Sequence, residues 1–271
     1  MNHTEEINYL RTLCAEVGII ARNTGEFIRK EVDRLQLSQV ETKSLHNFVT
    51  YVDKTAEEQL VEKLQALLPE AGFIVEENTI EQQDKEYQWI VDPLDGTTNF
   101  IHRVPVFSIS IALMHRKEIV LAVVYEINHN ECFWAVKCGG AFLNNEPIKV
   151  SKAATVHESL LATGFPYYDY SRLDQYMELF TWCLRNSHGV RRLGSAAVDL
   201  AYVACGRFEG FFEYSLSPWD VAAGSLLVQE AGGKVTDFSG GDHFVFGREI
   251  MATNHKIADE LLVKVKDAFK G

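Results

Sequence analysis

Two aspartates three positions apart, Asp92 and Asp95, carry the clearest chemistry in this chain. They lie in the stretch WIVDPLDGTTNF, where an apolar run that predicts a short buried strand breaks at DPLDG. Pro93 fixes its own backbone and Gly96 permits a sharp turn, so both carboxylates can face one space rather than opposite faces of a strand. Carboxylates gathered in this way predict a site for a divalent metal ion.

The same loop is suited to holding an anion. Gly96, Thr97 and Thr98 form a run of small residues, and their backbone amides would face a phosphate if a helix begins there. Taken alone, DPLDG is more simply explained as turn chemistry, because Asp beside Pro and Gly is common in loops. The TTN extension and the acidic clusters elsewhere in the chain favour a metal and phosphate site instead.

Two further segments place carboxylates at the end of a predicted strand or the start of a predicted helix. Glu76 and Glu77 follow the apolar FIV, and Asp220 opens the small-residue stretch DVAAGSLLVQEA. Oxygen ligands suit magnesium or manganese, and the sequence has no matching His or Cys set that would indicate zinc, so we expect Mg²⁺. Because clustered carboxylates repel one another and repel phosphate, metal ions must fill the site before a substrate binds.

These residues are positioned by alternating helical and strand patterns. Helical periodicity predicts helices over about 5–37, 55–68, 176–185, 219–231 and 256–269, and another after Ser195, which is a natural helix cap. Strand patterns predict FVTYVD ending at Asp53, FIV, the crowded runs VFSISIALM, IVLAVVYE and CFWAV, then LLATGF, FFEY, KVTD and REIMATN. The alternation favours a layered α/β architecture over a bundle or a sandwich.

Two interpretations concern packing around Asp220. Trp219 is expected to be a packing residue rather than a ligand, because large aromatic side chains usually serve cores. Ala222, Ala223 and Gly224 are expected to let the helix after Asp220 approach a sheet closely.

Charge and cysteine content limit the partners and the compartment. The net charge is −12 with no basic run, which argues against nucleic-acid polymers and anionic membranes as partners. No apolar run approaches the roughly 20 residues that span a bilayer, and the N-terminus lacks the pattern of a secretory signal. The five cysteines are odd in number and form no CxxC pair, so we expect reduced thiols in a cytoplasmic protein.

WIVDPLDGTTNF and SPWDVAAGSLLVQEAGG together resemble the two motifs of the inositol monophosphatase family, magnesium-dependent and lithium-sensitive phosphomonoesterases. The resemblance covers most of the chain. Lys43 lies in a polar loop expected to be mobile, Asp53 in FVTYVDK, and GSAAVDLAYVACG and FFEY follow in order. It implies an αβαβα layered fold, commonly as a homodimer. We expect one unit over 1–271, with subdomains of about 1–150, carrying the central metal site, and about 151–271, carrying the Asp220 helix and substrate-facing residues.

By matching position, the resemblance implies a role for each site residue. Glu76, Asp92 and the Leu94 carbonyl would bind one Mg²⁺ ion, while Asp92, Asp95 and Asp220 would bind a second, and a third, weaker ion would lie near Glu76. Asp53 and Thr97, with Glu76, would activate the attacking water. The implied substrate-binding residues are Asp95, Gly96, Thr97, Thr98, Ser195, Ala196, Glu213 and Asp220.

The implied activity is hydrolysis of a small phosphorylated alcohol or sugar, with myo-inositol monophosphate the leading substrate, by in-line attack of a metal-activated water. Thr98 favours this branch, since the nucleotide and histidinol-phosphate branches tend to have lysine after DGT. Fructose 1,6-bisphosphatase and 3′(2′),5′-bisphosphate nucleotidase activities stay open as alternatives, as does a non-catalytic sugar-phosphate-binding regulator. Val75, where the family often has glycine, and the short 78–86 connection could alter ion affinity or lithium response.

Overall fold

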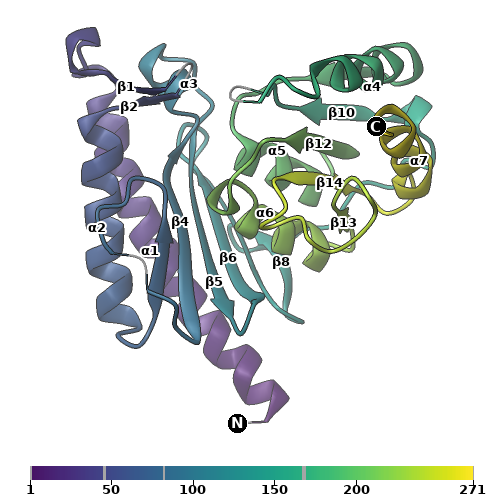
Figure 1. Ribbon diagram of the computed structural model, residues 1–271. Coiled ribbons are helices and arrows are strands. Elements are labelled where there is room, and N and C mark those ends of the chain that lie inside the picture. The colour runs from purple at the N-terminus through teal and green to yellow at the C-terminus, as the bar shows by residue number, and fades with distance from the viewer. Residues whose placement is uncertain (1, 45–46, 82, 167–168, 271) are drawn as a thin grey trace.

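The computed structural model describes residues 2–44, 47–81, 83–166 and 169–270. Helical and sheet layers alternate through the molecule, as Figure 1 shows. The five layers are α1 (His3–Glu31) with α2 (Tyr51–Leu67), a seven-stranded sheet, α5 (Ala196–Ala204) with α6 (Pro218–Glu230), a five-stranded sheet, and α4 (Leu173–Asn186) with α7 (Ala258–Ala268). The predicted αβαβα architecture is confirmed.

The seven-stranded sheet is a mainly antiparallel meander. Only its edge strand β3 pairs in parallel, with β4. In spatial order its strands are β3 (Gly72–Val75), β4 (Tyr87–Asp95), β5 (Ser108–His115), β6 (Glu118–Glu126), β7 (Glu131–Val136), β8 (Gly140–Leu143) and β9 (Glu146–Pro147).

The five-stranded sheet is mixed, with β11, β10 and β12 parallel and β14 and β13 antiparallel to their neighbours. In spatial order its strands are β11 (Gly189–Arg191), β10 (Leu160–Thr163), β12 (Gly210–Tyr214), β14 (Glu249–Thr253) and β13 (Lys234–Thr236). The remaining elements are the ribbon of β1 (Glu41–Ser44) and β2 (Asn47–Val49), the short helix α3 (Thr97–Ile101), and two 3₁₀ turns, Leu37–Gln39 and Val156–Glu158.

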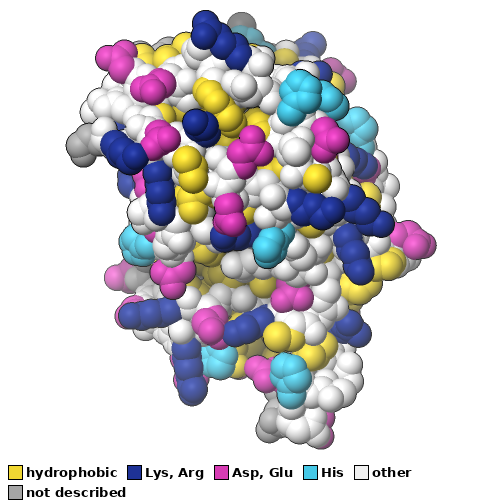
Figure 2. Space-filling view, turned by 90° about the vertical axis from the view of Figure 1, so that its right-hand side faces the viewer, with side chains coloured by type: hydrophobic (Ala, Val, Ile, Leu, Met, Phe, Trp, Pro, Cys, Tyr) yellow, Lys and Arg dark blue, Asp and Glu magenta, His cyan; other side chains and the backbone are white. Residues whose placement is uncertain are grey.

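The molecular surface mixes charges of both signs. Seen from the side of α4 and α7, Lys and Arg side chains are interspersed with Asp and Glu (Figure 2). Within the described ranges, every helix is too short or too polar to cross a bilayer.

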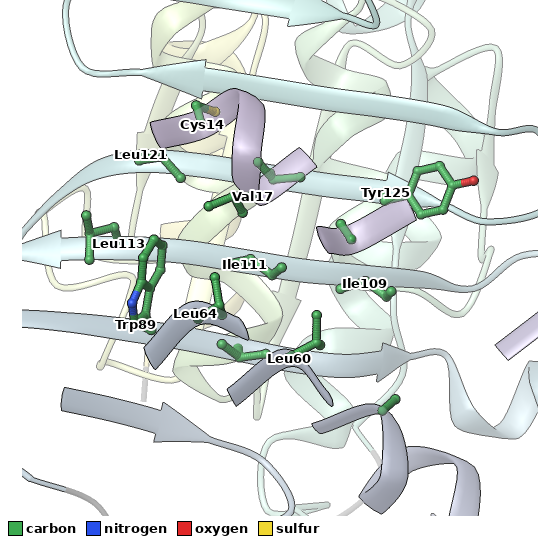
Figure 3. Close-up of a cluster of buried hydrophobic side chains, with 14 of the residues drawn as sticks. Cys14, Val17, Leu60, Leu64, Trp89, Ile109, Ile111, Leu113, Leu121 and Tyr125 are labelled. Atoms are coloured by element: carbon green, nitrogen blue, oxygen red, sulfur yellow. The ribbon is translucent and has the colours of Figure 1, made fainter. Parts of the chain in front are cut away.

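Separate hydrophobic cores hold the layers together. Along β4, Trp89 and Val91 enter the core beneath α1 and α2, while Ile90 between them enters the core beneath α5 and α6. Figure 3 shows the outer core, where Leu60 and Leu64 of α2 pack over the sheet. This alternation follows from the two-residue period of a strand, so both faces of the sheet are buried.

Small side chains form a row across the inner face of the seven-stranded sheet. Ala112, Ala122, Ala135 and Ala141 are consecutive cross-strand partners on β5, β6, β7 and β8, and all belong to the core that includes α6. Small side chains on the sheet therefore face the small side chains that were predicted to let α6 approach closely. Gly224 serves a different contact, because a Cβ there would lie 2.5 Å from Leu200 of α5.

The structure corrects the sequence prediction around the first helices. The first helix ends at Glu31 rather than near residue 37, and it continues without interruption through Gly25. Asp53 does not end a strand. It lies in the first turn of α2, because the Thr50 backbone N donates to Asp53 Oδ2 at 2.8 Å and completes a capping box. The loop expected around Lys43 is instead strand β1.

Candidate active site

A cavity of about 180 Å³ lies where β4, α3, α5, α6 and β12 meet. Segments far apart in the sequence contribute to its lining. The predicted site residues that line it are Glu76, Asp92, Leu94, Asp95, Gly96, Thr97, Thr98, Ser195, Ala196, Glu213 and Asp220. Asp53 lies behind Thr97, fully buried. The side chain of Lys43 lies outside the described residues, so its role and the mobility of its segment stay predictions.

A β-bulge directs Asp92 and Asp95 into the same cavity. Asp92 is paired with Ser110 and Asp95 with Ser108, so two residues of β4 lie opposite one residue of β5. The extra residue reverses the usual alternation of side chains. The strand therefore does not break at Asp92, as the sequence suggested, but continues through Asp95. The Leu94 backbone N donates to Asp92 Oδ1 at 2.9 Å and stabilises the bulge.

Three aspartates that line this cavity bring their carboxylates together. One oxygen from each of Asp92, Asp95 and Asp220 lies within 4.8 Å of the other two. Asp220 reaches the cluster from the first turn of α6, where its Oδ2 accepts from the Ser217 backbone N at 2.7 Å. Glu76, directly after β3, lines the same cavity and lies close enough to Asp92 to affect its ionisation.

Burial and mutual repulsion keep these acids from ionising readily. Burial, followed by the charges of Glu76, Asp95 and Asp220, raises the pKa of Asp92 well above its ordinary value. Burial, followed by the charge of Asp95, raises the pKa of Asp220 to about 7. Burial also raises the pKa of Asp95 to about 6, although hydrogen bonds from Ser195 and α5 amides oppose it. A divalent cation would relieve this repulsion, so the donor set fits Mg²⁺.

Asp95 is fixed by the start of α5. Its Oδ2 accepts from Ser195 Oγ at 2.6 Å and from the Ala197 backbone N at 2.8 Å. Ser195 is the predicted cap of this helix, and its Oγ also accepts from the Val198 backbone N at 3.3 Å. The Ser195 side chain is thus engaged in positioning a carboxylate, while its contact with substrate stays a prediction.

Thr97 connects the cavity to the buried Asp53. Thr97 Oγ1 lies 2.9 Å from Asp53 Oδ1 and 3.1 Å from the Leu94 carbonyl oxygen. The other Asp53 oxygen accepts from the backbone N and the hydroxyl of Thr50. The short helix α3 begins at Thr97, after Gly96 in a left-handed conformation with φ of 99°, so the condition set for amides facing an anion is met.

Glu57, which was not predicted as a site residue, positions the segment that carries Glu76. This fully buried side chain on α2 accepts from the backbone N of Glu77 at 2.7 Å and of Thr79 at 2.8 Å. The short connection after β3 is therefore tied to the helix that contributes Asp53. A glutamate on the buried face of an otherwise amphipathic helix was the available signal.

The wall of the cavity farther along α5 and β12 also contains residues that the sequence analysis missed. Asp199 and Arg192 line it together with the predicted Glu213. For Asp199 a signal was available in the sequence, because it is the one charged residue in AAVDLAYVA, a stretch otherwise suited to a core. Trp219 packs against the inner core, as predicted, and also lines the cavity.

Comparison with known proteins identifies the family. The model of the inositol monophosphatase family matches residues 10–268. The chain belongs to this family. Nus factor SuhB of Escherichia coli K12 is 41% identical over 248 residues, which are 91% of this chain and 93% of that protein.

Solved structures of family members share the fold. The extragenic suppressor protein SuhB of Bartonella henselae superposes with a TM-score of 0.85 at 38% identity, covering 91% of this chain and 95% of that one. An IMPase of Thermotoga maritima gives a TM-score of 0.85 at 34% identity, with 93% and 95% covered. Membership of this family supports phosphatase activity and divalent-metal binding in general terms. The Escherichia coli relative, however, is named as a Nus factor and not as a phosphatase.

Proposed function

We propose that this protein hydrolyses a small phosphomonoester, with myo-inositol monophosphate as the leading substrate and Mg²⁺ as the metal. The observation that carries the proposal is the coincidence, in one cavity, of the three-aspartate cluster and the Thr97–Asp53 hydrogen bond. The aspartate cluster can hold cations, and Asp53 can accept a proton through Thr97. Family membership and the IMPase relative support the same reading.

In this proposal Asp92, Asp95, Asp220, Glu76 and the Leu94 carbonyl would hold two Mg²⁺ ions, with a third, weaker ion near Glu76. When bound, the metal supplies positive charge for the phosphate and the departing oxygen and acidifies water. A water oxygen attacks phosphorus, the phosphorus–ester oxygen bond breaks, and the alcohol leaves after gaining a proton. The products are the free alcohol and inorganic phosphate.

The protein's own groups would orient the reactants. Thr97 Oγ1 would accept a hydrogen bond from the attacking water and pass its own proton toward Asp53 Oδ1, 2.9 Å away. The amides of Gly96 and Thr97, with Thr98 beside them, would hold the phosphate. Ser195, Ala196 and Glu213 would face the alcohol.

Phosphate-release kinetics would test the substrate. The panel contains myo-inositol monophosphate, fructose 1,6-bisphosphate, adenosine 3′,5′-bisphosphate and histidinol phosphate, each assayed with Mg²⁺ and again with added Li⁺. We expect the highest kcat/KM for the inositol ester and inhibition by Li⁺. A higher kcat/KM for the nucleotide or for the fructose bisphosphate would replace the leading substrate with that compound.

The name of the bacterial relatives favours a second candidate, a regulatory role independent of hydrolysis. Asp95→Asn separates the two. In cells that depend on this protein, loss of function in the variant would support hydrolysis as its role, whereas full function without phosphate release would support regulation. The predicted exclusion of nucleic-acid partners rests on net charge alone and stays a prediction.

We also propose a cytoplasmic homodimer. All five cysteines are free, three of them buried, as expected for a reducing compartment. The outer side of α4 exposes Leu173, Met177 and Leu184, at the i, i+4, i+11 spacing of a helix-packing stripe. The helix carries Asp174 near its start and Arg185 near its end, so an antiparallel copy would bring opposite charges together. Light scattering should give a dimer mass for the wild type and a monomer mass for Leu184→Glu.

A further inference from the structure

Asp199 is a buried carboxylate that the proposed mechanism does not use. Its side chain lies in the first turn of α5, is 1% exposed and lines the cavity. Among the described residues, its Oδ1 has no hydrogen-bond partner. Buried polar atoms are nearly always satisfied, so an unpartnered oxygen at a cavity wall indicates a place where a ligand donates.

The surroundings of Asp199 do not explain it as an ordinary structural ion pair. Glu213 and Asp95 both lie close enough to repel its charge, and Arg192 is the cation that opposes them. The same Arg192 also faces Glu213 and Asp95, and its guanidinium lies over the Phe165 ring, 5.2 Å from the centroid. Arg192 thus faces three carboxyl groups rather than Asp199 alone.

The chain makes room for this second acidic wall. A Cβ at Gly164 would lie 2.0 Å from the carboxylate atoms of Glu213, so only glycine leaves space for that carboxylate at the cavity. Asp199 and Glu213 therefore line the cavity as a pair of acceptors. They come from α5 and β12, whereas the predicted phosphate-holding amides come from the Gly96–Thr97 turn.

We propose that Asp199 binds the alcohol portion of the substrate, with its Oδ1 accepting a hydrogen bond from a hydroxyl that carries no phosphate. This assignment rests on the proposed phosphatase function. A hydroxyl can donate to Asp199 Oδ1, whereas a deprotonated phosphate or carboxylate offers that oxygen no donor. A substrate recognised in this way carries at least one hydroxyl besides its phosphate ester.

The position of Asp199 on α5 couples this contact to the metal cluster. The Ala197 amide, on the same helix, donates to Asp95. A hydroxyl held by Asp199 is thereby positioned relative to Asp95, since Asp199 lies on α5 and the start of that helix donates hydrogen bonds to Asp95.

The test compares two phosphate esters in the Mg²⁺-loaded enzyme. One is myo-inositol 1-phosphate, which has free hydroxyls, and the other is 4-nitrophenyl phosphate, which has none. For Asp199→Ala we expect about a tenfold loss of kcat/KM, mainly through KM, on the inositol ester, and an unchanged value on the aryl ester. Asp199→Asn retains an acceptor oxygen and should recover part of the loss.

Asp237→Asn is the matched control. Asp237 is also buried, but its Oδ1 accepts from Ser239 and the Gly241 backbone N, away from the cavity. This variant should unfold at a lower temperature and keep the wild-type ratio of kcat/KM for the two esters. Asp199→Ala should change that ratio without a matching loss of thermal stability.

Four results would overturn the assignment. Equal losses on both esters, or no loss on either, would show that Asp199 does not contact a substrate hydroxyl, while the proposed function stands. Hydrolysis of the aryl ester alone by the wild type would remove the polyol substrate class. Hydrolysis of neither ester by the wild type would overturn the proposed function itself, and this assignment with it.

Discussion

Asp95 illustrates how one side chain links two parts of the site. Its backbone belongs to β4, and its Oδ2 accepts hydrogen bonds from Ser195 and Ala197 at the start of α5. The same carboxylate takes part in the aspartate cluster. Loss of its charge would therefore affect both the position of α5 and the capacity of the cluster to hold cations.

Asp95→Asn should abolish measurable phosphate release, with kcat/KM falling by at least about 10²-fold, because a neutral amide cannot replace an anionic ligand. The far-ultraviolet circular dichroism spectrum should not change. Asp33→Asn is the control, since that carboxylate is 89% exposed and pairs only distantly with Arg103. Activity of Asp95→Asn within tenfold of the wild type would rule out the metal-dependent mechanism.

The pH dependence of stability should reveal the buried acids. In the folded protein the pKa of Asp220 is raised to about 7 and that of Asp95 to about 6. A raised pKa means that the folded state favours the protonated acid, so the associated stability is present below the unfolded-state value and lost as pH rises. The buried Asp92 and Glu213 shift in the same direction.

With EDTA present, the melting temperature should therefore fall between about pH 4 and pH 8. Added Mg²⁺ should raise it, and by more at pH 8 than at pH 5, because the ion binds the ionised carboxylates. Differential scanning calorimetry with and without Mg²⁺ measures both effects. A Mg²⁺ effect of equal size at the two pH values would contradict this account.

At the scale of elements, the start of α5 positions the site. Ser195 both caps the helix and holds Asp95. Ser195→Ala should lower the free energy of unfolding by about 1 kcal/mol through loss of the cap, and should weaken Mg²⁺ activation about 10–100-fold through loss of the contact to a ligand. Urea denaturation and Mg²⁺ titration of activity measure the two effects.

Thr155→Ala is the comparison for that variant. Thr155 caps the 3₁₀ turn Val156–Glu158, outside the cavity, so its loss should lower stability and leave Mg²⁺ activation unchanged. If both variants respond alike to Mg²⁺, Ser195 serves only the helix.

Much of the element order could be predicted from the sequence, because hydrophobic periodicity and capping are local. Ser195 as a helix cap and the small-residue helix that carries Asp220 are examples. The features that could not be predicted depend on strand register and on specific side-chain hydrogen bonds. The bulge that aligns Asp92 with Asp95 depends on register with β5, and the helical position of Asp53 depends on its bond to Thr50. Asp199 is recognisable in the sequence as a charge in an apolar helix, but its place beside Glu213 depends on how α5 packs near β12.

At the scale of the whole molecule, α6 carries Asp220 to a cluster whose other two members belong to the seven-stranded sheet. The alanine row of β5 to β8 lies in the same core as α6. The separation between this sheet and α6 is therefore part of the geometry of the site.

Ala122→Leu should push α6 outward, cost about 1–3 kcal/mol of unfolding free energy, and weaken Mg²⁺ activation although the residue lies outside the cavity lining. Leu121→Phe, on the opposite face of β6, is the matched control. It should cost similar stability and leave Mg²⁺ activation unchanged. Comparable Mg²⁺ activation in the two variants would show that the spacing of α6 does not set the cluster geometry.

The alanine row has a consequence for the choice of ion. Alanine has no side-chain rotamers, so the row cannot repack to let α6 move toward or away from the sheet. Mg²⁺ requires oxygen ligands at about 2.0–2.1 Å, whereas Ca²⁺ takes them at about 2.3–2.6 Å and tolerates irregular geometry. The four alanine methyl groups would then determine which ionic radius the site accepts, by fixing the distance between the sheet and α6. Family members with larger residues in this row should accept larger ions.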